Sequence, residues 1–482
     1  MLNLENVRKS LIRIAALALF SLAFFASVSA QQPRSVTIRV VPDRVLIEGT
    51  LPARSAWSFR DSYAGVLGLG NRIENLKLVD GKGIEIQTRK IAPGQFESAS
   101  AASKFSYEVK LTPGARSSEA ALVSWLTSEH GVLMLGDLLP SLDLPARLAI
   151  RIEVPTGWTV SSPDKVSLQN EFEITDPDRA VILVGKNLRL SARTPAGARL
   201  VLATDNEWAF KDDEAIDLAG RILKAHSDLA GRVPCSQAAL FMLPFPGPAP
   251  LDRWSAQTRG CAVVLLMGKQ PSRVGALSQL GNALTHEIFH LWIPNGVALQ
   301  GDYDWFYEGF TVYHAARTAV HMDLLTFTDF MAAIGRAYDG VTGATDLNNL
   351  SLIEASKRRW TTGSSGVYAK AMLMAFLIDL DLRSRSKGKR SLNDVYREMF
   401  RSPKTGDGNA VVTEVISQVD GRLPIQKLIS GPYTIDLQKE LAPYGLRVEK
   451  FGFRTRIVPN EKLTKPQRDL LRELGYNEPR KR

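Results

Sequence analysis

Two histidines four positions apart are the strongest chemical feature of the sequence. They are His286 and His290 in the stretch HEIFH, and Glu287 follows the first of them. On a helix, residues four apart share one face, so both imidazoles can reach one point in space. A catalytic zinc ion needs three protein ligands and one open position. The motif therefore predicts two zinc ligands, with Glu287 close enough to act on a metal-bound water.

A third ligand has to come from another segment, and Glu308 is the candidate. It lies in the run WFYEGF, eighteen positions after His290 and beyond a turn region long enough for the chain to reverse. Gly309 leaves room for a close approach of this second helix. The sequence thus predicts a Zn²⁺ site with three ligands: His286, His290 and Glu308.

The alternative is an ordinary helix that carries two surface histidines, which is common for an isolated HExxH. Here the helix is apolar around the motif, so both side chains are expected to be partly buried and to need partners. Ser278 is a candidate cap for this helix, and Pro294 ends it. His314 and His321 are expected to be ordinary helix residues, because the three ligands are already supplied.

The pattern along the chain predicts a multidomain α+β protein. Alternating apolar and polar residues with turn residues between them run from about residue 35 to 193, which favours an N-terminal β-sandwich. Helical spacing begins after residue 195, and helices dominate after about residue 326. We expect five segments: a signal peptide (1–30), a β-sandwich domain (31–195), a catalytic domain (196–325), a helical C-terminal domain (326–450) and a basic tail (451–482).

Composition and the first thirty residues bound the class of protein. The 482 residues are 45% hydrophobic and 23% charged, as in globular proteins of several domains. The formal charge is +10, but no stripe of basic and aromatic residues suggests nucleic acid. A basic start, an apolar run over 14–28 and small residues at 28–30 predict a signal peptide cleaved near Ala30. The protein is then periplasmic or secreted, with no later membrane span; an uncleaved anchor is the alternative.

The chain has two cysteines, Cys235 and Cys261, each at the start of an apolar run that resembles a strand. One disulfide is possible. If the two runs pair antiparallel, however, the cysteines lie at opposite ends and cannot bond. This reasoning favours two buried free thiols.

The stretches HEIFHLW, WFYEGFTVY and GVYAKAMLMAFLIDLDLRSRSKGKRSLNDVYREMF together resemble the glycyl aminopeptidase family of gluzincin metallopeptidases. That family is related to the aminopeptidase N family. The resemblance implies a thermolysin-like zinc metallopeptidase domain between a β-domain and a helical C-terminal domain. It implies zinc on the three ligands above and a general base at Glu287. It also points to Tyr368, where the families use a tyrosine phenol to stabilise the oxyanion, although Ala371 replaces the glycine of their motif.

One departure from the families concerns the substrate. They normally hold a substrate α-amino group with an acidic residue before the HExxH, yet no Glu occurs between Glu214 and Glu287. Asp252 is the only acid in the loop where such a clamp would lie. We therefore expect a zinc metallopeptidase that cuts peptides or proteins with endopeptidase-like or relaxed specificity. The alternatives are an aminopeptidase that uses Asp252 and a non-catalytic zinc-binding interaction protein.

Overall fold

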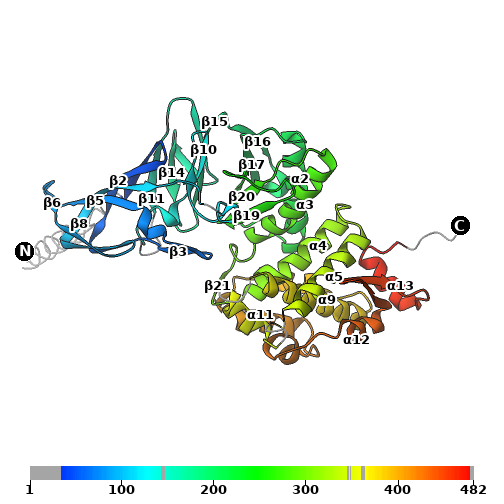
Figure 1. Ribbon diagram of the computed structural model, residues 1–482. Helices are drawn as coiled ribbons and strands as arrows, with labels where there is room; N and C mark the ends of the chain where they lie inside the picture. Colours follow the sequence, from blue (N-terminus) through cyan, green and yellow to red (C-terminus); the bar gives the residue numbers. More distant parts are fainter. Residues whose placement is uncertain are drawn as a thin grey trace, which may run out of the picture.

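The computed structural model describes residues 34–114, 116–142, 147–344, 347, 349–359 and 364–477. The signal peptide expected at residues 1–30 lies outside these ranges. Strands gather at one end of the molecule and helices at the other, so the chain is a multidomain α+β protein with a sheet-rich N-terminal region and a helical C-terminal part (Figure 1). Among the described residues, no helix combines the length and the apolar character needed to cross a membrane.

Two large sheets form the framework of the N-terminal region over its described residues, as alternating hydrophobicity predicts. The larger has the strand order β13 (Lys165–Leu168), β14 (Glu171–Ile174), β11 (Leu148–Glu153), β1 (Ser35–Val41), β2 (Arg44–Ser58), β8 (Gln95–Lys110), β5 (Ile73–Val79) and β6 (Glu85–Ile86), with β7 (Thr88–Ala92) beside β8. The smaller has the order β12 (Trp158–Ser161), β15 (Val181–Lys186), β10 (His130–Met134) and β9 (Trp125–Leu126). A single apolar core joins them, with Ile38 and Ile47 from the larger sheet and Leu133 and Val184 from the smaller.

A third sheet lies between the N-terminal sheets and the helices. Its order is β16 (Arg189–Arg193), β17 (Arg199–Thr204), β18 (Gln237–Pro244), β20 (Ala262–Met267) and β19 (Trp254–Arg259). One face packs on α2 (Asp212–Ala230) and α3 (Arg273–Glu287), with Leu240 and Leu265 in the shared core. The other face packs on the smaller N-terminal sheet, where Phe241 meets Val132 and Leu183. The strand β19 forms the edge and borders the site described below.

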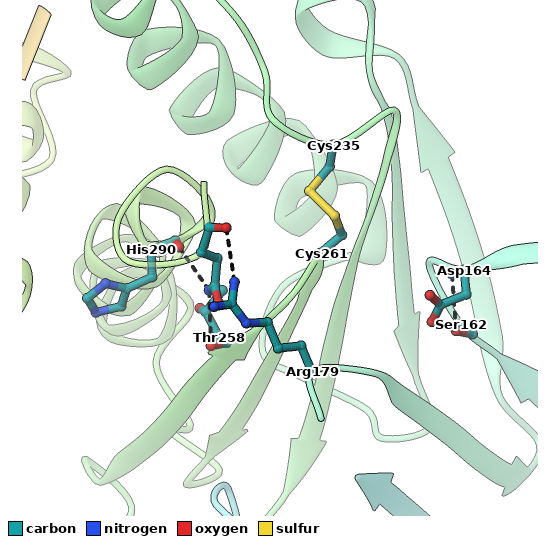
Figure 2. Close-up of a disulfide and its surroundings, with 8 residues drawn as sticks. Ser162, Asp164, Arg179, Cys235, Thr258, Cys261 and His290 are labelled. Carbon is teal, nitrogen blue, oxygen red and sulfur yellow. Dashed lines mark hydrogen bonds between the residues drawn. A yellow bond between two sulfur atoms is a disulfide. The ribbon is translucent and has the colours of Figure 1, made fainter. Parts of the chain in front are cut away.

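The cysteines form a disulfide, so the expectation of free thiols was wrong. Cys235 and Cys261 have their Cα atoms 6.0 Å apart. The reason is the strand direction: β18 and β20 pair parallel, because β19 returns the chain between them. Parallel neighbours begin at the same edge of a sheet, which places both cysteines together (Figure 2).

Helices make up most of the remaining chain. They are α4 (Thr311–His321), α5 (Phe327–Gly343), α7 (Leu352–Lys357), α9 (Ser364–Ser386), α10 (Leu392–Arg401), α11 (Gly408–Val419), α12 (Leu437–Leu441) and α13 (Lys465–Glu473). Short sheets accompany them: β21 (Ala298–Gln300) with β22 (Thr405–Asp407), and β23 (Leu446–Phe451) with β24 (Arg454–Pro459); a third, β3 (Ser62–Tyr63) with β4 (Val66–Leu67), lies in the N-terminal region. The segment after residue 451 contributes β24, which packs on α5, and α13.

Candidate metal centre and its cavity

The HExxH motif lies where α3 passes into the 3₁₀ turn η5 (Ile288–Leu291). The helix begins at Arg273, and the side chain of Ser272 accepts a hydrogen bond from the backbone N–H of Gly275. Ser278, the cap suggested by sequence, lies inside the helix instead. The four-residue spacing brings the Nε2 atoms of His286 and His290 to 3.0 Å from one another.

Glu308 joins the two histidines from a second element, the π-helical turn η6 (Trp305–Phe310). Its Oε2 atom lies 3.4 Å from the Nε2 atoms of both His286 and His290. The three side chains form a group with ligand atoms within 4.8 Å of one another, which is a possible metal site. Gly309 is required here, because a Cβ at this position would lie 2.2 Å from the Cβ of Ala371 on α9.

Hydrogen bonds and charge orient this group. The Nδ1–H of His290 donates to the carbonyl oxygen of Ile293 at 2.8 Å, which leaves Nε2 for a metal. Burial lowers the pKa of His290, but the carboxylate of Glu308 outweighs it and raises that pKa to about 9. Burial likewise opposes ionisation of Glu308, yet His290, His286 and Arg359 hold the pKa of its carboxyl well below the usual range. Two imidazoles and an ionised carboxylate are a donor set that suits zinc.

Glu287 lies in the same cavity and is 4% exposed. The hydroxyl of Thr258, on the edge strand β19, lies 2.9 Å from a carboxylate oxygen of Glu287 and 2.8 Å from its carbonyl oxygen. The amide of Asn295 then ties this strand to the metal motif, since it donates to the carbonyl oxygens of both Thr258 and His290. Figure 2 shows Thr258 and His290 close together on one side of the disulfide.

Tyr368, on α9, also lines this cavity, whose volume is about 780 Å³. Its hydroxyl accepts a hydrogen bond from the guanidinium of Arg359. Burial, followed by the nearby charge of Glu308, raises the pKa of the Tyr368 phenol, so it stays protonated at neutral pH. Arg359 also donates to Glu308 at 3.1 Å and pairs with Asp304. Sequence reasoning missed Arg359, because it lies outside any regular chemical motif.

The structure keeps other candidates out of the cavity. His314 pairs with His226 of α2 at 3.3 Å, and both rings contact Phe289; His321 is exposed. Asp252 is exposed in a turn before β19 and does not line the cavity. A cavity of about 850 Å³ between α5 and β24 contains none of the predicted site residues.

The fold and the site together define a class: a chain with an aminopeptidase N-like fold and a possible His/Glu metal site. The structure is similar to the crystal structure of an aminopeptidase N family protein from Idiomarina loihiensis, with a TM-score of 0.74. The two sequences are 15% identical, and the match covers 86% of this chain and 79% of that chain. At this identity the likeness concerns the fold. No protein-family model and no curated protein matches the sequence.

Proposed function

We propose that the protein is an exported zinc metallopeptidase that hydrolyses peptide bonds with endopeptidase-like or relaxed specificity. One observation carries the proposal: His286, His290, Glu287, Glu308 and Tyr368 all line one cavity. These are the residues for which the sequence resembles the glycyl aminopeptidase family. The thermolysin-like character of the domain over residues 196–325, and the other domain boundaries expected from sequence, belong to the same proposal.

Zinc is the metal that this donor set fits best. Two imidazole nitrogens and one carboxylate oxygen are ligands used in catalytic zinc sites, and three ligands leave a position open. The hydrogen bond from His290 to Ile293 orients one ligand, and Arg359 orients Glu308. Zinc bound there would lower the pKa of its water and polarise the scissile carbonyl.

Glu287 is the general base in this proposal. The Thr258 hydroxyl fixes the carboxylate, which faces the cavity that holds the metal group. Glu287 takes a proton from the attacking water and then delivers it to the leaving amine. Because the side chain is buried, little bulk water competes for that proton.

Tyr368 supplies the oxyanion donor. Its phenol is protonated at neutral pH and can donate to negative charge that develops on the carbonyl oxygen. The guanidinium of Arg359 donates to the phenol oxygen, which polarises the O–H bond and strengthens it as a donor. Arg359 is therefore a positioning residue for both Tyr368 and Glu308.

The proposed preference for internal cleavage follows from the acidic residues of the cavity. A free α-ammonium group needs an anionic partner beside the scissile bond. Asp252 lies outside the cavity. Among the described residues, Asp178 is the one acid that lines it outside the metal centre, and it pairs with Arg60 at 3.2 Å. This supports internal cleavage. Aminopeptidase action is the second candidate, favoured by the likeness to the aminopeptidase N family protein.

The disulfide supports export, because such bonds persist in oxidising compartments and are rare in the cytosol. The predicted signal peptide agrees with a periplasmic or secreted protein.

The experiment is a product map with a metal assay. Purified protein is assayed for zinc, and a peptide library and its N-acetylated twin are digested, with cleavage positions read by mass spectrometry. We expect about one zinc per chain, internal cuts in both libraries, and loss of cleavage with a chelator that zinc restores. Cleavage abolished by acetylation would establish the aminopeptidase alternative. A protein without zinc that cuts nothing and gains no thermal stability from zinc would overturn the proposal.

A further inference from the structure

The wall of the cavity formed by the strands is lined by arginines. Apart from the metal centre and Arg359 beside it, the charged residues that line it among those described are Arg60, Arg179, Arg259 and Asp178. Arg179 is half-exposed, pairs with Asp176 and donates to the carbonyl oxygen of Asn295. Arg60 pairs with Asp178. Arg259 differs from both, because no salt bridge of the described residues includes it.

Arg259 is 4% exposed and ends β19. One of its nitrogens, Nη2, donates to the carbonyl oxygen of Leu122 at 2.9 Å. Its Nε and Nη1 are buried and have no hydrogen-bond partner among the described residues. A buried guanidinium with two unused donors is costly unless a partner arrives. Because Arg259 lines the cavity, a ligand can supply that partner.

The guanidinium is also held in place. It lies over the ring of Tyr63, with Cζ 3.8 Å from the ring centroid, and Arg60 lies over the same ring at 5.2 Å. An aromatic face that holds a guanidinium restricts its orientation, so less freedom is lost when a ligand binds. Its unused N–H groups, on Nε and Nη1, are charged donors of the kind that carboxylate oxygens accept from.

The place of Arg259 on β19 relates its guanidinium to the reaction. Arg259 follows Thr258, the residue whose hydroxyl contacts the carboxylate of Glu287. Successive side chains of a strand point to opposite faces, yet Thr258 and Arg259 both line the cavity. A peptide bound in the cavity can therefore contact Arg259 while its scissile bond lies at the metal centre.

We propose that Arg259 forms a carboxylate-binding subsite, so that the enzyme favours peptides with an acidic group close to the scissile bond. The inference rests on the proposed function and extends it to a class of substrate. The carboxylate can be an Asp or Glu side chain, or the C-terminal carboxylate of the peptide. In either case the subsite repels a free α-ammonium group.

The test uses matched peptides with the full mature protein. One set exchanges Glu for Gln at each position around the cut, and a second exchanges a C-terminal acid for an amide. We expect kcat/KM to be at least about tenfold higher for the acidic member of one set, as a hydrogen-bonded charge pair typically gives. The set that responds identifies the source of the carboxylate. Equal values in both sets overturn the proposal.

Variants then assign the preference to a residue. Arg259→Gln should bring the ratio close to one, and Arg259→Lys should retain part of it, because lysine keeps the charge without the fork. The control is Arg253→Gln, an exposed arginine before β19 that does not line the cavity, and it should keep the full preference. A preference that survives Arg259→Gln overturns the assignment. If Arg259→Gln does not fold, the kcat/KM ratio of the acidic to the neutral peptide for Arg259→Lys decides. A ratio below the wild-type value supports the assignment, and an unchanged ratio overturns it.

The design separates the two proposals. If no peptide is cut, the proposed function fails and binding of the same peptide pairs is measured by calorimetry. Tighter binding of the acidic members, lost in the Arg259 variants, still supports the subsite. Equal binding overturns it.

Discussion

Two histidine pairs lie close to the turn that follows α3, and they differ in whether a carboxylate lies beside them. His286 and His290 approach to 3.0 Å with Glu308 beside both, whereas His226 and His314 approach to 3.3 Å without a carboxylate. Glu308 raises the pKa of His290 to about 9. Burial lowers the pKa of His226 to about 3, with a hydrogen bond to the carbonyl oxygen of Thr285 acting against it. The protonated imidazole is thus favoured at His290, beside Glu308, whereas His226 is a neutral ring that packs in the core.

The difference between the two pairs shows that two neighbouring imidazole rings do not by themselves define a metal site. The second pair contacts Phe289 with ring centroids 5.0 and 4.2 Å away, and His226 hydrogen-bonds to Thr285, the residue before the first ligand. It therefore packs against the turn that carries His290. The charge that a divalent ion requires comes from Glu308, which the second pair lacks.

The largest effect is expected from removing a ligand. His286→Ala or Glu308→Ala leaves two ligands, so zinc binding and turnover should be lost, with an affinity decrease beyond the roughly 10–100-fold seen for outer partners. His314→Ala is the matched control and should keep its zinc while lowering Tm. Zinc content by mass spectrometry after dialysis measures this. Equal metal loss in all three would mean that the ligand set is wrong.

Glu287→Gln should separate metal binding from chemistry. The amide keeps the size of the side chain but cannot take a proton, so kcat should fall by about 10²–10⁴-fold while bound zinc is unchanged. Stopped assays on a cleaved peptide, together with zinc content, measure both. Activity within a few-fold of the wild type would remove Glu287 from the mechanism.

Tyr368→Phe should have the next largest effect. It removes one donor to the developing oxyanion, which typically costs about 10²–10³ in kcat with a smaller change in KM. Because Arg359 remains beside the site, zinc content should stay constant. A kcat that does not change would make Tyr368 a packing residue like Tyr313, a buried tyrosine on α4 that bonds to Asp379.

The site could be predicted from sequence where its geometry is local or carried by a motif. The helical spacing of His286 and His290 brings them together, and Glu308 of the WFYEGF run lies 3.4 Å from both. The sequence did not reveal Arg359 or Thr258, because their contacts join segments dozens of residues apart. Only the resemblance pointed to Tyr368.

In the fold, the sheet-rich start and helical end follow from hydrophobic periodicity, but strand order does not. The sequence of β19 does not indicate a strand, since WSAQTR has no run of large apolar residues. Missing this strand turned a parallel pair into an expected antiparallel one and led to the wrong conclusion about Cys235 and Cys261. Pairing is decided by contacts distant in sequence, which periodicity does not report.

The smallest effect is a pH dependence, and the two pairs should show it with opposite sign. In the metal-free protein the pKa of His290 is raised to about 9, so the stability from its proton is complete below about pH 6.5 and is lost as pH rises through 9. The pKa of His226 is lowered to about 3, so its contribution is present above about pH 6.5 and is lost as pH falls toward 3.

Zinc needs the deprotonated His290 and competes with the proton. The increase in Tm on adding zinc should therefore become larger from pH 6.5 to pH 8.5. The zinc-binding free energy that underlies it should gain at most about 1.4 kcal/mol per pH unit. Thermal melts with and without zinc, in buffers that do not bind metal, measure this, and His314→Ala should keep the trend. A zinc-induced shift that stays constant over this range would show that no proton on His290 opposes the metal.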